Sequence, residues 1–341
     1  MLVSSSPQVE WIPAEFNRGW SYTHRVATDD SGQSVVELLA KRYRHSSVAI
    51  WHQRLLAGEL QLNHEQVEVD QRVAAGDCLV WNRPPWIEPA VPKEVEVIFD
   101  DDDLLVINKP AGLPVTPGGG FLDHTLTRLL ELLFSHSNNL PIPKPVHRLG
   151  RFTSGLMLCA RKAQTRAELA AMFRFSTAGL SSCRKIYRAL TRPSSQLRLR
   201  EPIDIQVPIA QFKHSRYGKV WGPFLNKVQV GQAVAISGKK LSAFSSIQLL
   251  ERREHEDLLE VSITTGRPHQ IRIHLAAIGI PLIGDPFYGI AGFISDHATL
   301  GEGGYFLHSH RVLNLPYKGN VYQFEAIPPT PLRLFSAQNV Y

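Results

Sequence analysis

Apolar residues recur at helical spacing in two stretches near the N-terminus. The segment QSVVELLAKRYR predicts one helix, and AIWHQRLLAGELQLN predicts a second, from Ile50 to Leu56, that ends near Gly58. The following residues alternate between apolar and polar over 60–69, and a turn at Gly76 precedes one more alternating run. We therefore expect two helices and a few short strands to form a small binding module over residues 19–82.

A proline-rich stretch follows this module. RPPWIEPAVPKE, residues 83–94, contains four prolines. Proline can neither continue a helix nor pair within a central strand, because it lacks the backbone N–H. The stretch is therefore predicted to be a linker.

The remaining residues, 95–335, alternate short apolar runs with a few amphipathic ones. Three segments have helical spacing: DHTLTRLLELLFS, KAQTRAELAAMFRF and HQIRIHLAAIG. The acidic run 100–103 predicts a solvated turn. The strand-like runs follow one another with few helices between them, at 104–108, 156–160, 184–190, 203–209, 243–251 and 258–265. This order predicts class α+β, with a mixed, largely antiparallel sheet and helices on its flanks.

Composition narrows the range of functions. The chain has 341 residues, 43% of them hydrophobic, and no apolar run long enough to predict a membrane span. Its first residues lack the basic and apolar regions of a secretory signal. Cys78, Cys159 and Cys183 are spaced for neither a disulfide framework nor a metal site, which is typical of a cytoplasmic protein. The net charge of +6 favours a polyanionic partner such as a nucleic acid.

Four stretches concentrate polar residues between apolar ones: HRLGRFTSG at 147–155, CRKIYRAL at 183–190, TGRPHQIRIH at 265–274 and GDPFYG at 284–289. In the third, a turn at Gly266 precedes polar residues at the start of a predicted helix: Arg267, His269, Gln270, Arg272 and His274. Helix N-termini present unpaired N–H groups and partial positive charge. The stretch therefore predicts a site for phosphate or a nucleotide.

Metal and dinucleotide sites are less well supported. His269 and His274 are five residues apart, so they do not share a helix face. His308 and His310 could lie on one side of a strand, but no cysteine or carboxylate completes either pair. The glycines of PGGGF, residues 117–121, lack the spacing of a dinucleotide site. We expect no metal and no cofactor.

Taken together, these motifs resemble the RluA-type RNA pseudouridine synthase family. The family motif His-Arg-Leu-Asp-x-x-Thr-Ser-Gly is similar to HRLGRFTSG, Lys-x-Tyr-x-Ala to KIYRA, and Gly-Arg-x-His-Gln-Ile-Arg-x-His to GRPHQIRIH. GDPFYG, LHSHRVL and LLVINKPAGLPVTPG are also similar to family motifs, and the resemblance covers about 95–330. The module at 19–82 resembles an S4-type RNA-binding domain over WHQRLLAGELQLNHEQVEVDQRVAAGDCLVW.

The resemblance implies the pseudouridine synthase fold and the isomerisation of specific uridines in ribosomal or transfer RNA. Arg148 matches the arginine that occupies the space of the flipped base, and Tyr187 matches the tyrosine placed to take the C5 proton. Arg267 matches the arginine that pairs with the catalytic aspartate. The protein is expected to be a monomer without a membrane partner. RNA contacts are expected from His147, Thr153, His269, Gln270, Arg272, His52, Arg54 and Arg42.

One position departs from the family pattern. Gly150 stands where the family has its catalytic aspartate, and glycine cannot stabilise or capture the positive charge that develops at C1′. In one interpretation another carboxylate, Asp285 or Asp123, reaches the site. Some plant and cyanobacterial-type members of the family also have His-Arg-Leu-Gly, so the glycine would then be a feature of a subfamily. In a second, the chain is a catalytically inactive RNA-binding relative. A glycosidase would need a spaced carboxylate pair, which does not accompany these motifs.

Overall fold

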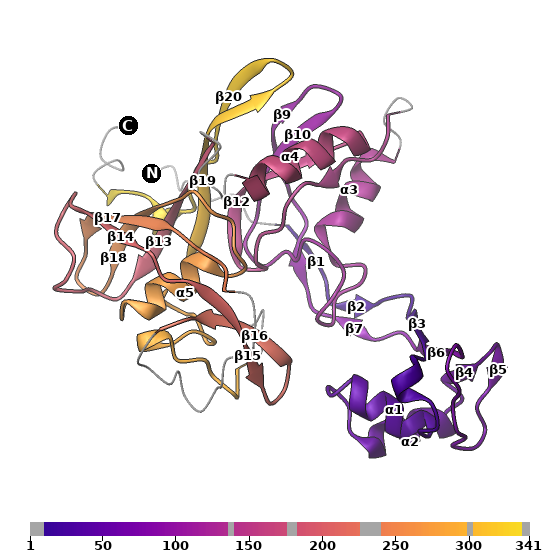
Figure 1. Cartoon of the computed structure of the whole chain (residues 1–341). Helices are drawn as coiled ribbons and strands as arrows, with labels where there is room; N and C mark the ends of the chain where they lie inside the picture. The colour runs from indigo at the N-terminus through magenta and orange to yellow at the C-terminus, as the bar shows by residue number, and fades with distance from the viewer. Residues whose placement is uncertain (1–9, 136–139, 176–182, 226–239, 299–302, 336–341) are drawn as a thin grey trace, which may run out of the picture. The chain divides into compact units, whose positions relative to one another are not determined.

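The chain folds into two compact units, each described here by itself. The computed structural model describes residues 10–135, 140–175, 183–225, 240–298 and 303–335 (Figure 1). The larger unit consists of Met1–Pro13, Ala90–Phe212 and Trp221–Tyr341. The smaller unit consists of Ala14–Pro89 and Lys213–Val220.

A ten-stranded mixed sheet forms the centre of the larger unit. Its strand order is β14-β17-β18-β13-β19-β12-β10-β9, with β11 beside β12 and β20 beside β19. Among the described pairs of this sheet, β12 and β19 are parallel and the others antiparallel. The predicted class α+β is therefore confirmed. The strands are β9 (Glu96–Asp100), β10 (Leu104–Lys109), β11 (Lys144–Pro145), β12 (Thr153–Ala160), β13 (Arg184–Thr191), β14 (Pro202–Ile205), β17 (Ser245–Arg252), β18 (Asp257–Ile263), β19 (Leu307–Tyr317) and β20 (Asn320–Glu325).

Three helices pack against this sheet: α3 (Leu126–Phe134), α4 (Ala163–Phe175) and α5 (Gln270–Ala277) (Figure 1). The side chains of β12 alternate between two of them. Leu156 and Leu158 belong to one apolar cluster with Leu169 of α4, whereas Met157 shares another cluster with Leu129 of α3. Because both faces of β12 are covered, its sequence is a continuous apolar run and not an alternating one.

The acidic run before β10 is not the solvated turn that its charge predicts. The Asp103 carboxylate is buried and accepts hydrogen bonds from the Lys162 N–H at 3.0 Å and the Thr165 hydroxyl at 2.7 Å, at the start of α4. Asp100 forms an ion pair with Arg161 at 2.6 Å. The run therefore ties the β9–β10 hairpin to α4. Partners about sixty residues away leave no local signal in the sequence.

The smaller unit has the expected helix pair, α1 (Val35–Arg42) and α2 (Val48–Leu56), each with a serine N-cap. Ser47 accepts a hydrogen bond from the Ile50 N–H, so α2 begins two residues before its predicted start. Trp51 of α2 and Leu79 share the apolar core. The sheet has the order β3-β6-β4-β5, with β3 (Trp20–Arg25), β6 (Cys78–Arg83), β4 (Leu60–Leu62) and β5 (Glu65–Gln66).

The proline-rich stretch 83–94 is more structured than a linker. Its β7 (Ile87–Glu88) pairs with β2 (Glu15–Phe16), and its β8 (Val91–Pro92) pairs with β1 (Trp11–Ile12). The boundary between the two units, after Pro89, falls inside it. Both pairings are two-stranded, as expected for a segment whose prolines restrict it to edge positions.

The remaining short elements lie outside these sheets and helices. They are the paired strands β15 (Ile209–His214) and β16 (Gly218–Pro223) and the 3-10 turns η1 (Thr28–Asp30), η3 (Ile290–Gly292) and η4 (Thr330–Leu332). In the described part of the chain, no helix is both long and apolar enough to span a membrane.

The parallel pairing of β12 with β19 depends on a glycine. Gly155 lies opposite Ser309 with φ at +102°, and a Cβ at this position would overlap the Ser309 carbonyl oxygen. Two backbones can approach this closely only where neither has a side chain in the way. The glycine of HRLGRFTSG is therefore required by the sheet.

We predict that Gly155→Ala lowers the free energy of unfolding by about 3 kcal/mol or more, because the methyl group forces β12 and β19 apart in a strained backbone. Gly304→Ala is the matched control, since its Cβ would meet no atom within 4 Å and its φ is ordinary. Urea denaturation of both variants measures the difference. Equal, small effects would contradict this account of the pairing.

Two buried histidines stabilise the larger unit in their neutral form. The His308 Nε2–H donates to the Ala326 carbonyl at 3.1 Å, which leaves Nδ1 to accept from the Ser154 hydroxyl at 2.9 Å. His274 donates to the Val207 carbonyl at 2.9 Å. Burial lowers the pKa of each imidazole to about 4, although these carbonyl contacts act in the opposite direction.

The stability of the protein is therefore predicted to fall as the pH falls from about 6.5 toward 4. The unfolded histidines titrate near pH 6.5, so within this window the unfolded state binds more protons, at about 1.4 kcal/mol per histidine per pH unit. Urea denaturation at pH 7.5 and 5.5 measures the slope. His308→Gln should make the slope shallower, and an unchanged slope would show that His308 is not held neutral.

Candidate active site

A cleft of about 880 Å³ opens in the larger unit where three of the four polar stretches meet. It lies beside the start of β12, the middle of β13, the loop before α5 and the residues just before β19. Its polar and charged lining residues are Thr116, His147, Arg148, Arg151, Thr153, Lys185, Tyr187, Arg267, His269, Gln270, Arg272 and Tyr305. Sequence reasoning named most of them, and the fold brings them together from positions more than 150 residues apart.

The lining of this cleft is strongly cationic. Its cations are Arg148, Arg151, Lys185, Arg267 and Arg272. Among the residues that the structure describes, no aspartate or glutamate lines the cleft. An unbalanced positive surface of this kind attracts a polyanion and holds phosphate groups at its rim.

A buried lysine that sequence reasoning missed holds the loops beside the cleft. The Lys109 ammonium at the end of β10 donates to three backbone carbonyls, those of Pro110 and Leu113 at 2.8 Å and that of Arg151 at 3.2 Å. Burial lowers the pKa of Lys109 to about 7, and Arg151 acts in the same direction. The signal for this role in the sequence was a lysine at the end of a largely apolar strand.

Gly150 lies at the turn that leads into β12, where its carbonyl accepts a hydrogen bond from the Thr153 N–H at 3.0 Å. A Cβ built on this glycine would overlap the Tyr305 hydroxyl and would lie 3.3 Å from the Thr153 hydroxyl oxygen. The space next to Gly150 is therefore filled by a tyrosine side chain. Sequence reasoning did not identify Tyr305.

Tyr187 projects from β13 into the cleft beside Val261 and Ser309 of the neighbouring strands. It is only 7% exposed. Burial raises the pKa of its phenol to about 12, although a hydrogen bond with Ser309 lowers it. The side chain is thus neutral near pH 7 and presents an apolar ring with one polar atom.

The loop before α5 is braced from inside by Gln270. Its carbonyl oxygen accepts from the Thr265 hydroxyl at 2.6 Å and from the Arg267 N–H at 3.1 Å. Its amide group donates to the Phe244 carbonyl at 2.8 Å and to the Ser245 hydroxyl at 3.0 Å. These bonds use the hydrogen-bonding capacity of Gln270 within the protein. Its structural role is to hold Arg267 at the cleft, where we had predicted an RNA contact.

Arg267 itself donates from Nε to the Ser242 carbonyl at 2.9 Å. The family pairing of this arginine with an aspartate has no counterpart at Gly150. The cleft therefore keeps the cation of the expected pair without its carboxylate.

The two histidines that line the cleft are held neutral. His147 Nε2 accepts from the Leu158 N–H at 3.2 Å, and His269 Nδ1 lies 2.7 Å from the Tyr288 hydroxyl. Burial lowers the pKa of each imidazole to about 3, and neighbouring cations add to the effect. Near neutral pH both side chains therefore act as polar, uncharged groups.

The two proposed substitute carboxylates are placed away from the cleft lining. Asp285 accepts two hydrogen bonds from the Arg272 guanidinium, both at 2.7 Å, and further bonds from the Phe287 and Tyr288 N–H groups. Its side chain is 1% exposed, so it serves as the buried partner of Arg272. Asp123 lies outside the set of cleft residues as well. The surroundings of both side chains therefore do not suit the role that we considered for them, which was to replace the missing aspartate at position 150.

In the smaller unit the predicted RNA-binding residues have different surroundings. Arg42 forms an ion pair with the buried Asp30, and Arg54 stacks on Trp51 and Trp81 at 4.4 and 4.1 Å. Both cations are thus tied into the unit, whereas the predictions placed them against phosphates. His52 is exposed on α2.

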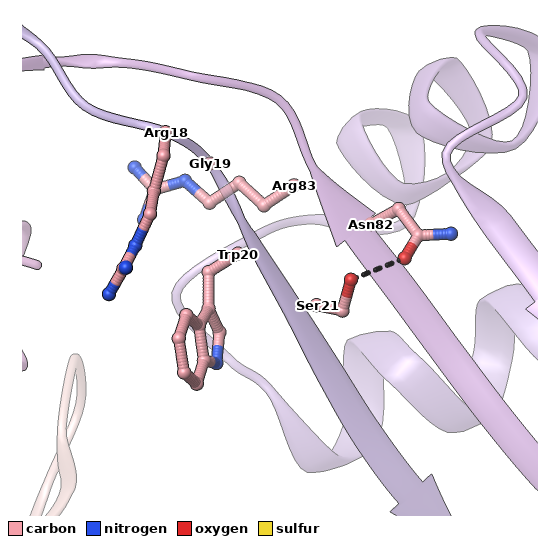
Figure 2. Close-up of a pocket in the computed structure, with 6 residues that line it drawn as sticks. All are labelled: Arg18, Gly19, Trp20, Ser21, Asn82 and Arg83. Carbon is pink, nitrogen blue, oxygen red and sulfur yellow. Dashed lines mark hydrogen bonds between the residues drawn. The ribbon is translucent and has the colours of Figure 1, made fainter.

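The smaller unit has a pocket of its own, whose cations sequence reasoning missed. It is lined by Arg18, Gly19, Trp20, Ser21, Asn82 and Arg83, and Figure 2 shows the two guanidinium groups on the same side as the Trp20 ring. The Arg83 guanidinium stacks on Trp86 at 3.4 Å. Ser21 donates to Asn82 at 2.6 Å, which joins β3 to β6 beneath the pocket. A signal was present in the sequence, since arginine and tryptophan lie two residues apart both where β3 begins (Arg18, Trp20) and where β6 ends (Trp81, Arg83).

Metal ligands do not cluster in the described residues: no group of three His, Cys, Asp or Glu side chains is placed to hold an ion there. His308 and His310, the nearest pair in the sequence, both hydrogen-bond to the Ala326 carbonyl.

Comparisons with known proteins agree on one family. The family described as RNA pseudouridylate synthase matches residues 103–277. An uncharacterized RNA pseudouridine synthase of Synechocystis is 37% identical over 82% of this chain and 88% of its own length. RNA pseudouridine synthase 5 of Arabidopsis thaliana is 34% identical over 96% of this chain and 98% of its own. Ribosomal large subunit pseudouridine synthase C of Yersinia pestis is 28% identical over 90% and 92%.

A solved structure, human RNA pseudouridylate synthase domain containing 1, shares the fold. It superposes with a TM-score of 0.50 and 18% identity over 71% of this chain and 87% of its own. The residues matched by the family, 103–277, include the three motifs that line the cleft. The chain therefore belongs to the RNA pseudouridylate synthase family, the isomerases that convert uridine in RNA to pseudouridine.

Proposed function

We propose that this chain is an active pseudouridine synthase that acts on ribosomal RNA and binds its target uridine in the cationic cleft. The observation that carries the proposal is the cleft itself, which combines five cations with the buried phenol of Tyr187. Ribosomal RNA is favoured over transfer RNA because relatives from Yersinia pestis and Pseudomonas aeruginosa are named for the large ribosomal subunit.

The dimensions of the cleft suit one nucleotide that has left the RNA stack. Its volume of about 880 Å³ lies within the range of small-molecule sites. An enzyme that changes the bond between a base and its sugar must first extrude the nucleotide, and it needs cations to hold the flanking phosphates. Arg148 is exposed at the rim of the cleft, and its side chain is suited to occupy the space in the RNA stack that the extruded base leaves.

Tyr187 is suited to the part of the reaction that takes place on the base. Its ring packs in the apolar cluster of β13 and β18, and its hydroxyl is a polar atom that β13 presents to the cleft together with the Lys185 ammonium. In the proposed reaction the base stacks on this ring and turns over, and the Tyr187 oxygen takes up the C5 proton as its own hydroxyl proton passes on to solvent. His147, Thr153 and His269 are proposed to contact the nucleotide as uncharged polar groups.

The module at 19–82 is proposed to bind a second segment of the RNA. Arg18, Trp20 and Arg83 combine cations with an exposed aromatic ring, the arrangement that holds single-stranded or looped RNA. The S4-type assignment of this module, with His52 exposed beside it, remains a prediction from sequence.

We further infer that the protein works as a monomer in the cytoplasm. The cytoplasmic part of this inference is supported by the three cysteines, which form no disulfide and two of which are buried. Free thiols of this kind persist in a reducing compartment.

The activity is predicted to be detectable by tritium release. Ribosomal and transfer RNA labelled at uridine C5 are incubated with the purified protein, and release is expected from ribosomal RNA, because the C5 proton leaves when the new bond forms. Tyr187→Phe should slow single-turnover release by about 100-fold or more, since it removes the proton acceptor. Tyr322→Phe, on β20 outside the cleft, is the matched control.

The inactive alternative makes the opposite prediction for the same experiment. A relative that only binds RNA would retain both RNAs on the filter and release no tritium from either one. Release from transfer RNA alone would contradict the proposed substrate but not the activity.

RNA affinity is predicted to depend on the pocket in Figure 2. Arg83→Ala should weaken RNA binding and reduce the slope of log Kd against log salt by about one, because one phosphate contact and its counterion release are lost. Arg198→Ala removes an equally positive side chain that is 79% exposed elsewhere and serves as the control. Filter binding at several salt concentrations measures both, and identical slopes would exclude a role for the pocket.

A further inference from the structure

The side chain next to Gly150 is a tyrosine whose oxygen lies where a carboxylate would begin. A Cβ on residue 150 would overlap the Tyr305 hydroxyl, while the rest of the ring is farther away, with Cζ at 3.6 Å. An aspartate at 150 and the hydroxyl of Tyr305 therefore compete for one position. The glycine and the tyrosine form a matched pair, in which the small residue makes room for the large one.

The fold holds the Tyr305 hydroxyl firmly at the wall of the cleft. Its ring is 3% exposed and makes an edge-to-face contact with Phe152 at 6.0 Å. Its oxygen lies 3.4 Å from the Thr153 hydroxyl. The backbone just before Tyr305 packs on the GDPFYG loop. Gly284 of this loop has a positive φ, and a Cβ there would lie only 2.9 Å from the Gly304 carbonyl oxygen. That loop motif thus positions Tyr305.

A cation lies over the Tyr305 ring. The Arg272 guanidinium is 4.4 Å from the ring centroid and is fixed in place by its two hydrogen bonds to Asp285. Although burial acts to lower the pKa of Arg272, the contacts with Asp285 and Tyr305 raise it, so this side chain stays charged. Asp285 therefore contributes to the site by orienting Arg272 and not by reaching the substrate.

These contacts point to a role for the phenol oxygen. No carboxylate of the described residues lines the cleft, yet the reaction develops positive charge at C1′ that an oxygen nucleophile must stabilise or capture. A tyrosine performs this role in some glycoside-cleaving enzymes. Thr153 offers the only comparable oxygen beside Gly150 among the cleft residues, and an alcohol ionises far less readily than a phenol.

We propose that Tyr305 is a catalytic residue and takes the place of the missing aspartate. The inference rests on the proposed isomerase activity. The Tyr305 hydroxyl gives its proton to solvent and regains it when the reaction ends. Its oxygen attacks C1′ of the target uridine, the C1′–N1 bond breaks, and the electron pair of that bond leaves with the uracil anion.

The second half of the reaction restores the tyrosine. The uracil turns over, and C5 attacks C1′ while the C1′–oxygen bond returns its electron pair to Tyr305. The C5 proton is then removed and N1 gains a proton, which gives pseudouridine with no net change in atoms or electrons. The cations of the cleft compensate the negative charge of the phenolate and of the uracil anion.

The test is single-turnover tritium release by Tyr305→Phe, which removes one oxygen atom from a buried ring. We expect a loss of about 1,000-fold or more, with the melting temperature and the RNA Kd close to those of the native protein. Tyr322→Phe, outside the cleft, is the control and should retain release within about tenfold. Thr153→Val is measured beside it as the variant of the neighbouring hydroxyl.

The outcomes separate the two proposals. If the native protein releases no tritium, the proposed function fails. If the native protein is active and Tyr305→Phe retains release within about tenfold, Tyr305 is not the catalytic residue. Loss of release in Thr153→Val with retention in Tyr305→Phe would assign the role to Thr153 and would overturn the inference.

A double-mutant cycle tests the shared position without using activity. Gly150→Asp alone should lower the melting temperature, because its side chain overlaps the Tyr305 hydroxyl. Adding Tyr305→Phe removes that oxygen, so the melting temperature should rise in the Gly150→Asp background and not in the native one. Additive effects would show that the two side chains do not compete, and would contradict the placement on which the inference depends.

Discussion

The parallel contact between β12 and β19 is the constraint on which the site depends. Thr153 pairs with Leu307 and Gly155 with Ser309, so residues about 150 positions apart become neighbours. Because Gly155 has no side chain, the two strands approach closely, and the turns that precede them converge at one end of the pair. One of these turns carries Gly150 and the other carries Tyr305. The same strand β19 also pairs with β13, where Tyr187 lies opposite Ser309.

Burial and pairing decide which side chains in and around the site carry charge. Asp285, which the sequence suggested for the cleft, is bound by Arg272 and two backbone N–H groups. Asp103 and Asp100, predicted to be solvated, hold the start of α4. The cleft is left with a positive excess and with neutral imidazoles. This arrangement favours a polyanionic substrate and negatively charged intermediates, and it leaves oxygen atoms of hydroxyl groups as the nucleophiles that the cleft can offer.

Much of this was predictable from the sequence, because periodicity and motif order depend on local and regular features. The helices at 35–42 and 126–134, six strands of the sheet and the residues Arg148, Tyr187 and Arg267 were found in this way. The misses share one physical cause, which is a partner distant in sequence. Asp103 was predicted to be solvated and Tyr305 was not identified, because their contacts arise only when segments far apart in the chain meet. The contacts of Gln270 with Phe244 and of Arg54 with Trp81 were unforeseen for the same reason.

The central claim is that a tyrosine oxygen stands at the anomeric carbon of the target nucleotide. The most direct measurement is a crystal structure of the protein with ribosomal RNA that carries pseudouridine at the target position, because this product keeps its C1′ in the cleft and does not react further. The account predicts the Tyr305 oxygen within about 3.5 Å of C1′ and on the side opposite the base. A carboxylate at that distance, with the Tyr305 hydroxyl turned away from the sugar, would contradict it.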